Sequence, residues 1–261
     1  MEIKIEKDVI GLVKEVGEFI RKERESFTYD AVELKSFNNL VSYVDKQAES
    51  KLIEGLGKLV PEAGFLAEEG TVQQSESQWQ WIIDPLDGTT NFVHNIPAYS
   101  ISVALAFEED VYLGVVYEVT RKECFYAIKD KGAFLDGKPI RISTRKLLEE
   151  SLIATGFPYH DFGKTRIYFD ILEEMMRKTQ GVRRIGSAAL DLAYTACGRF
   201  EAFFEYNLNP WDVAAGALLV KEAGGTVSDF SGGNGFLFGR EIIAGGNVYP
   251  LILEIIKHKW N

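Results

Sequence analysis

The sequence predicts a mixed α/β fold in which helices and sheets pack in layers, and three features of the chain lead to this prediction. Apolar residues recur at helical spacing through residues 6–25. Residues 98–142 alternate between apolar and small or polar side chains, as in an antiparallel meander. Beyond residue 145, short strand patterns alternate with helix patterns, which is typical of α/β layers.

The first half begins with two predicted helices. Residues 6–25 place their apolar side chains on one face, with Lys and Glu between them. A second helix is expected over residues 45–59, with Asp45 as its N-cap and Pro61 just beyond its end. Both apolar faces are expected to cover the core.

The predicted sheet of the first half starts with a buried strand at residues 80–84, which ends in the carboxylate of Asp84. The meander of residues 98–142 follows, and Glu108-Glu109-Asp110 is expected to form one of its turns. Asp136-Gly137 is a second turn signal in this segment.

The second half has the pattern of alternating strands and helices. Strands are expected at residues 151–155, 182–185, 201–205, 225–229 and 241–244, and helices at residues 162–178, 188–197, 211–223 and 248–258. The change of pattern near residue 145 divides the chain into residues 1–145 and 146–261. No linker-like composition marks this boundary, so the two halves are expected to share one core.

The composition excludes several classes of protein. The chain has 261 residues, of which 46% are hydrophobic and 26% charged, as in ordinary globular domains. Its net charge is −10 and no dense run of Lys and Arg occurs, so a nucleic-acid partner is not expected. Cys124 and Cys197 lie far apart and are expected to be free thiols. With no signal peptide and no stretch of roughly 18 apolar residues, the sequence predicts a soluble cytoplasmic protein without a membrane partner.

Acidic residues gather in three short motifs that point to metal-assisted chemistry. Asp84 and Asp87 flank a proline turn directly after the apolar strand, and such close carboxylates repel each other unless a cation lies between them. Oxygen ligands favour Mg²⁺, Mn²⁺ or Ca²⁺ over Zn²⁺. The following Gly88-Thr89-Thr90 would direct backbone amides toward an anion if a helix begins there. The other two motifs are Ala67-Glu68-Glu69-Gly70 and Asn209-Pro210-Trp211-Asp212.

A purely structural alternative exists for Asp84 and Asp87, namely an Asx-turn and a helix N-cap. This alternative would be favoured for an arbitrary Asp-Pro-x-Asp-Gly segment. The complete string from Trp81 to Phe92, together with two further acidic motifs, favours a metal site instead.

The motifs resemble the signatures of the inositol monophosphatase family. Residues 81–92 are similar to its metal-binding signature, and Glu68-Glu69 matches its upstream acidic pair. Residues 211–216, followed by Glu222-Ala223-Gly224-Gly225, are similar to its second signature. The resemblance extends from Lys35 to Gly246. It implies an α-β-α-β-α sandwich of the sugar-phosphatase type, in which residues 1–145 form a metal-binding α+β half and residues 146–261 an α/β half that completes the active site.

The resemblance also implies two to three Mg²⁺ ions per active site. Glu68, Asp84 and the carbonyl of Leu86 would hold a first Mg²⁺. Asp84, Asp87 and Asp212 would hold a second. A third, weaker Mg²⁺ would lie beside Glu68 and contact it through water.

The remaining implied roles concern the substrate. Backbone amides of Gly88 and Thr89 would face the phosphate, and the Thr89 hydroxyl would orient the attacking water with the support of Asp45. Glu68, Thr89 and Asp45 are therefore the predicted catalytic residues, and Lys35 is expected close behind them. The predicted substrate-binding residues are Asp87, Gly88, Thr89, Gly186, Ser187, Ala188, Glu205 and Asp212, of which Glu205 would accept hydrogen bonds from the hydroxyls of the alcohol.

The implied activity is Mg²⁺-dependent, lithium-sensitive hydrolysis of inositol 1-phosphate, a small phosphorylated polyol, by a homodimer. Thr90-Asn91 is similar to the inositol phosphatase branch of the family, whereas the nucleotide 3′-phosphatase branch tends to carry Lys-Glu there. Fructose-1,6-bisphosphatase and histidinol-phosphate phosphatase are alternatives of the same chemistry. A catalytically idle protein that binds a macromolecular partner is the alternative from a different class.

Two other groups of residues were weighed as functional candidates. His94, His160 and His258 are too scattered to predict a metal site, and a packing role is favoured for His94. Arg183-Arg184 is interpreted as a solvated strand end, with a contact to a second phosphate or to a partner as the alternative.

Overall fold

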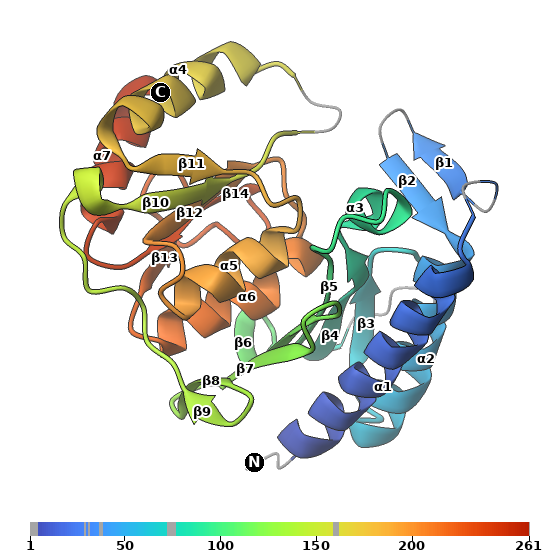
Figure 1. Cartoon of the computed structure of the whole chain (residues 1–261). Coiled ribbons are helices and arrows are strands. Elements are labelled where there is room, and N and C mark those ends of the chain that lie inside the picture. Colours follow the sequence, from blue (N-terminus) through green and yellow to red (C-terminus); the bar gives the residue numbers. More distant parts are fainter. Residues whose placement is uncertain are drawn as a thin grey trace.

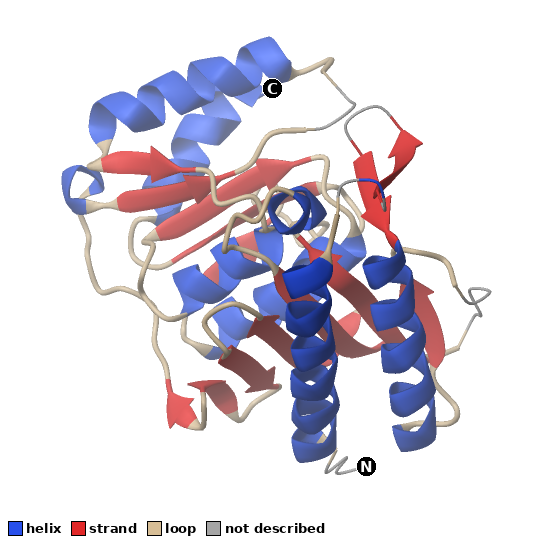
Figure 2. Ribbon diagram, turned by 45° about the vertical axis from the view of Figure 1, so that its right-hand side comes forward, coloured by secondary structure: helices blue, strands red, loops and turns tan. Residues whose placement is uncertain are grey.

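Five layers make up the molecule, in the order helix, sheet, helix, sheet, helix (Figure 1 and Figure 2). A computed structural model describes residues 5–28, 30, 32–36, 39–71, 77–158 and 162–260, without the side chains of residues 33–36, 39 and 40. The layered mixed α/β fold expected from the sequence is therefore confirmed, and it is the α-β-α-β-α sandwich that the family resemblance implied.

The first layer consists of two long helices that lie side by side, α1 (Glu6–Ser26) and α2 (Tyr43–Leu59). Both were predicted, but the N-cap of α2 is Ser42 and not Asp45. Val44 N donates to Ser42 Oγ at 3.1 Å, and the amide of Ser42 donates to Asp45 Oδ2 at 2.8 Å. This capping box places Asp45 inside the first turn, because the acidic residue of such a box reaches back to the cap.

The second layer is a seven-stranded sheet whose strands follow one another in sequence order, β3-β4-β5-β6-β7-β8-β9. Its strands are β3 (Gly64–Ala67), β4 (Trp79–Asp87), β5 (Ser100–Phe107), β6 (Asp110–Glu118), β7 (Glu123–Ile128), β8 (Gly132–Leu135) and β9 (Lys138–Pro139). Strand β3 runs parallel to β4, and all other neighbours are antiparallel, so the predicted meander is confirmed.

Three short elements of the first half were not predicted as such. A hairpin of β1 (Val32–Ser36) and β2 (Asn39–Ser42) leads directly into α2. Strand β3 extends the sheet beside β4. A five-residue helix, α3 (Thr89–Val93), follows β4 and begins where the sequence left a helix start open.

The second sheet has the order β11-β10-β12-β14-β13 and forms the fourth layer. Its strands are β10 (Leu152–Thr155), β11 (Gly181–Arg183), β12 (Ala202–Tyr206), β13 (Thr226–Ser228) and β14 (Glu241–Gly245). Strand β10 is parallel to both β11 and β12, whereas β14 is antiparallel to β12 and β13. A short 3₁₀ helix (Leu148–Glu150) precedes β10.

Helices fill the space on both sides of this second sheet. Helices α5 (Ala188–Ala196) and α6 (Pro210–Glu222) lie between the two sheets, and α4 (Thr165–Lys178) and α7 (Tyr249–Trp260) cover the outer face (Figure 1). All four were predicted. Residues 213–220 of α6 are buried on every side, because the helix packs on α5 and on both sheets, and this explains its lack of a polar face. No helix of the described ranges has the length and apolar character needed to cross a membrane.

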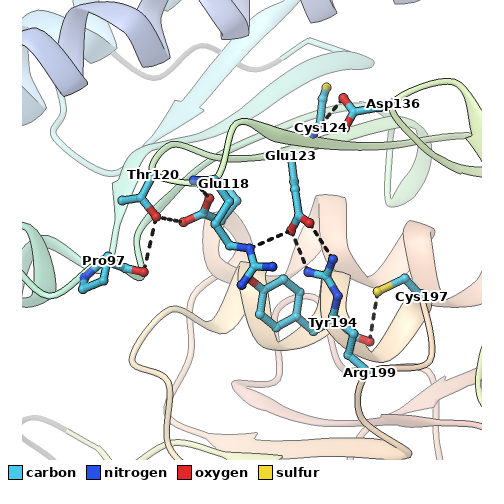
Figure 3. Close-up of polar contacts among 10 residues, drawn as sticks. Pro97, Glu118, Thr120, Glu123, Cys124, Asp136, Tyr194, Cys197 and Arg199 are labelled. Carbon is cyan, nitrogen blue, oxygen red and sulfur yellow. Dashed lines mark hydrogen bonds and ion pairs between the residues drawn. The ribbon is translucent and has the colours of Figure 1, made fainter.

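An ion pair links the first sheet to the end of α5 (Figure 3). The two terminal nitrogens of the Arg199 guanidinium donate to the two carboxylate oxygens of Glu123, each at 2.6 Å. The same guanidinium lies 4.5 Å from the centroid of the Tyr194 ring. The two cysteines nearby, Cys124 and Cys197, are both free, as expected from the sequence.

Candidate active site and metal centre

One cavity collects nearly all residues that the sequence singled out. It lies where the end of β4, the start of α3, the N-terminus of α5, the end of β12 and the N-terminus of α6 meet. The predicted residues that line it are Glu68, Asp84, Leu86, Asp87, Gly88, Thr89, Gly186, Ser187, Ala188, Glu205 and Asp212. Asp45 does not line the cavity and is buried behind Thr89.

Asp84 is held in place by the turn that follows it. Its Oδ1 accepts a hydrogen bond from the amide of Leu86 at 2.9 Å, which is the Asx-turn considered in the sequence. Pairing of β4 with β5 shifts register between Asp84 and Asp87, so this irregularity sets both carboxylates at the strand end. Burial, followed by repulsion from Glu68 and the neighbouring aspartates, raises the pKa of Asp84 well above its usual range.

Asp87 connects the turn after β4 to the N-terminus of α5. Its Oδ2 accepts from Ser187 Oγ at 2.6 Å and from the amide of Ala189 at 2.8 Å. Burial raises the pKa of Asp87 to about 6, although these hydrogen bonds act in the opposite direction. Ser187 Oγ also lies 3.1 Å from Ser100 Oγ on β5, so a short series of hydrogen bonds joins the first sheet to α5 at the cavity.

Asp212 is positioned by the start of α6. Asn209 is the N-cap, Pro210 is the first helical residue, and the amide of Asn209 donates to Asp212 Oδ2 at 2.6 Å. Burial, then repulsion from Asp87 and from Glu68, raises the pKa of Asp212 well above its usual value. The helix therefore directs a carboxylate, at the cost of electrostatic repulsion, toward those at the end of β4.

The Asx-turn considered for Asp84 is thus present. Asp87, however, is not a helix N-cap, because Gly88 is the N-cap of α3 and Ser187 that of α5. Both carboxylates nevertheless accept hydrogen bonds from backbone amides. These bonds do not compete with a role in metal binding, because hydrogen bonds from backbone amides orient a ligating carboxylate. No three His, Cys, Asp or Glu side chains of the described part of the chain are placed as an assembled metal site.

The donor chemistry of the cavity nevertheless fits a hard divalent cation. Besides burial, the charge of Glu68 raises the pKa of Asp84, Asp87 and Asp212, and neighbouring aspartates raise the pKa of Asp84 and Asp212 further. Negative charge is therefore in excess here. A bound cation would relieve this repulsion, and oxygen donors without His or Cys are those that Mg²⁺ prefers. The residues that would hold it are Glu68, Asp84, Asp87, Asp212 and the Leu86 carbonyl.

Thr89 begins α3 at the edge of the acidic cluster. Gly88, its N-cap, has a φ of 95°, and a side chain there would crowd the carbonyls of Ala98 and Gly186, so glycine is required. The Thr89 hydroxyl lies 3.0 Å from Asp45 Oδ1 and 3.1 Å from the carbonyl of Leu86. The amides of the first turn of a helix lack intrahelical acceptors, so this is a suitable place for an anion.

The cavity is also lined by Glu205, near the end of β12. Its side chain is 7% exposed, and burial raises its pKa well above the usual range while Arg184 opposes that shift. Gly156, at the end of the neighbouring β10, faces this carboxylate so closely that a Cβ atom would overlap it. The absence of a side chain at Gly156 therefore makes room for Glu205.

Sequence reasoning missed several residues that line the cavity. They are Gly156, Phe157, Pro158, Asp191, Asn207 and Leu208. Thr90 and Asn209, which belong to the predicted motifs, line it as well. Arg184 is exposed directly after β11, as expected of a solvated strand end, and it also lines the cavity. One signal was available for Asp191, because it is the only charged residue in the otherwise apolar segment 188–193.

The other candidates lie elsewhere. His94 and His258 do not line the cavity, and His160 and the side chain of Lys35 lie outside the described residues. His94 is exposed just after α3, so the predicted packing role is not evident in its surroundings.

The layered sandwich and the acidic cavity at the ends of its strands and helices define a class of α/β phosphatases. The chain belongs to the inositol monophosphatase family, whose model matches residues 4–260. It is 43% identical to Nus factor SuhB of Escherichia coli K12, over 90% of this chain and 89% of that protein.

Solved structures agree with this assignment. The extragenic suppressor protein suhB from Bartonella henselae superposes with a TM-score of 0.90 and 38% identity, covering 96% of this chain and 97% of the other. The IMPase of Thermotoga maritima superposes with a TM-score of 0.87 and 36% identity, covering 96% of both chains.

Proposed function

We propose that this protein is a Mg²⁺-dependent phosphomonoesterase that hydrolyses inositol 1-phosphate to inositol and phosphate. The observation that supports this most strongly is the placement of Asp84, Asp87 and Asp212 in one cavity with Thr89 and Glu205. Carboxylates that can hold Mg²⁺ and the amides of a helix start are suited to the phosphate, and the buried Glu205 side chain is suited to an alcohol rich in hydroxyls.

Bound Mg²⁺ would neutralise phosphate charge, promote ionisation of water and stabilise the leaving alkoxide. The chain itself positions the phosphate and the attacking water. Amides at Gly88 and Thr89 face the phosphate, and the Thr89 hydroxyl, held beside Asp45, orients the attacking water. Phosphoryl transfer needs little more from a protein than such alignment and electrostatic stabilisation.

The leaving alcohol occupies the side lined by Gly186, Ser187, Ala188 and Glu205. The start of α5 is fixed through Asp87, which accepts from Ser187 Oγ and from the amide of Ala189, so the phosphate and alcohol sides of the cavity share one hydrogen-bonded frame. The Glu205 carboxylate is suited to accept hydrogen bonds from a polyol.

A second candidate function follows from the comparisons. The E. coli relative is named a Nus factor, and that name favours the alternative of a protein that acts by binding a partner. The cluster of buried carboxylates supports the enzyme, because such charges are costly and an idle site has no need of them. The homodimer, the cytoplasmic location and the absence of a nucleic-acid partner remain predictions.

A phosphate-release screen with Mg²⁺ tests the proposal. The substrates are inositol monophosphates, fructose 1,6-bisphosphate, histidinol phosphate and nucleotide 3′-phosphates. We expect inositol 1-phosphate to give the highest kcat/KM and Asp212→Asn to abolish its hydrolysis. The variant Glu118→Gln is the matched control, because Glu118 is a buried carboxylate outside the cavity. If wild type and Asp212→Asn released phosphate at equal rates, the activity would come from a contaminating phosphatase, which would contradict the proposal.

A further inference from the structure

Asp191 stands out among the buried charges of the molecule. It lies in α5 between Leu190 and Leu192, which are completely buried, and its own exposure is 1%. Its Oδ1 has no hydrogen-bond partner. Ser187 is the N-cap of α5, and its Oγ accepts a hydrogen bond from the amide of Leu190. The Asp191 side chain is therefore not needed as a cap.

A buried carboxylate oxygen without a hydrogen bond is costly to a folded protein. Alanine or leucine would fit the surroundings of this helix better, since its neighbours in residues 188–193 are apolar. Such unsatisfied groups are rare in native structures and tend to have a functional reason. The reason must lie in what Asp191 faces.

Asp191 faces the cavity, together with Glu205 and Arg184. Burial raises the pKa of both acids well above the usual range, the charge of Glu205 adds to the shift at Asp191, and the guanidinium of Arg184 opposes the shift in both. Two carboxylates and one guanidinium thus line the cavity that also holds Thr89.

We infer that Asp191 is a further specificity-determining residue, which with Glu205 and Arg184 binds the hydroxyl groups of the leaving alcohol. This rests on the proposed phosphatase function. Carboxylates accept hydrogen bonds and a guanidinium donates them, so the three groups match an alcohol with several hydroxyls, each of which does both. A leaving group without hydroxyls leaves the acids unsatisfied, and sites of this kind reject such analogues strongly.

The experiment compares two substrates in the full-length protein with Mg²⁺. Myo-inositol 1-phosphate presents ring hydroxyls, whereas p-nitrophenyl phosphate presents none. The measured quantity is the ratio of their kcat/KM values for wild type, Asp191→Asn and Asp191→Ala. We expect the ratio to fall by about tenfold to a hundredfold in Asp191→Ala, the range for losing a hydrogen bond to a charged group, and by less in Asp191→Asn. Glu118→Gln, which removes a buried carboxylate outside the cavity, should leave the ratio unchanged.

Thermal melting of the same variants separates this role from a structural one. Removal of an unpartnered carboxylate should leave the melting temperature unchanged or raise it. If both Asp191 variants unfold, or if both substrates lose activity equally, Asp191 is structural and the inference is overturned. If wild type hydrolyses neither substrate, the proposed function itself fails, which is a different result.

Discussion

The hydroxyl of Thr89 lies 3.0 Å from Oδ1 of Asp45 and so joins the first turn of α3 to the first turn of α2. Asp45 is fixed from the other side, because Ser42 donates to its Oδ2 from both the amide and Oγ, at 2.8 and 2.6 Å. Burial raises the pKa of Asp45, although the hydrogen bonds from Ser42 and Thr89 oppose this shift. The two residues therefore form one unit at the edge of the acidic cavity.

The first prediction concerns this unit. Thr89→Ala and Asp45→Asn should each reduce kcat by roughly 10²–10⁴-fold with little change in KM, because their hydrogen bonds would act mainly in the transition state. The double variant should be no worse than the more severe single variant, since the residues act together. Thr89→Ser should retain much of the activity. Steady-state kinetics on inositol 1-phosphate measures all four.

A structural role for the pair predicts another pattern. If Thr89 and Asp45 served only to fix the helix starts, each variant would melt at a lower temperature while kcat stayed near the wild-type value. Melting curves recorded beside the kinetics distinguish these outcomes.

The second prediction concerns Mg²⁺. Activity should vanish with a chelator and return with Mg²⁺, and the ion should stabilise the fold by about 2.7 kcal/mol at a hundredfold excess over its Kd. Asp84→Asn should raise the melting temperature of the metal-free protein, because it relieves repulsion among the carboxylates. The same variant should lose the stabilisation by Mg²⁺. Full activity in excess chelator would rule out this arrangement.

The third prediction concerns lithium. The family resemblance implies that Li⁺ inhibits by occupying the second metal position, formed by Asp84, Asp87 and Asp212. Inhibition should be uncompetitive with the substrate in initial-rate measurements. A rate that is unchanged by Li⁺ well above physiological concentrations would argue against the lithium-sensitive branch.

The fourth prediction concerns Gly156 and Glu205. A Cβ atom on Gly156 would overlap the Glu205 carboxylate, so Gly156→Ala should displace that carboxylate from the cavity. KM for inositol 1-phosphate should rise about tenfold, as for loss of one hydrogen bond, and KM for p-nitrophenyl phosphate should hardly change. Glu205→Gln should show the same selective effect. Gly11→Ala is the control, because a Cβ atom there meets nothing within 4 Å. Equal effects on both substrates would remove Glu205 from the alcohol side.

The fifth prediction concerns stability and the Glu123–Arg199 ion pair (Figure 3). Hydrogen bonds from Arg199 lower the pKa of Glu123, so the pair stabilises the fold above the pKa that Glu123 has in the unfolded chain, and this is lost as pH falls through the folded value. Arg199→Met should therefore cost about 1 kcal/mol of unfolding free energy at pH 7 and much less near pH 3.

The control for this ion pair is Arg177→Met, which removes an exposed pair with Glu173 on α4. This variant should lower the free energy of unfolding by at most about 0.3–0.5 kcal/mol. Urea unfolding at both pH values measures the two variants, and a cost for Arg199→Met that does not shrink in acid would assign its effect to packing on Tyr194 instead.

Much of the fold could be predicted because long elements carry strong periodic signals. The two N-terminal helices, the meander and helices α4 and α7 have buried faces that appear directly in the sequence, whereas α5 and α6 are buried almost all round and appear as apolar runs. The hairpin β1–β2 and strand β3 are four or five residues long, and such short segments carry too few residues for a period to show. The N-cap of α2 is Ser42, whereas Asp45 was predicted, and the reason is local. Either residue type fits an N-cap, and only the direction of the backbone selects between them.

By itself, the sequence determined which groups are candidates for the chemistry. Asp84, Asp87 and Gly88-Thr89 are neighbours along the chain, so their pattern and the family resemblance identified them without coordinates. The tertiary structure decided which distant groups meet them. Asp45 reaches Thr89, Ser187 reaches Asp87, and Asp191 joins Glu205 and Arg184 only because α2, α5 and β12 pack around the end of β4. Hydrogen bonds and charge interactions act over a few ångströms in space, and separation along the chain carries no information about that distance until the layers have packed.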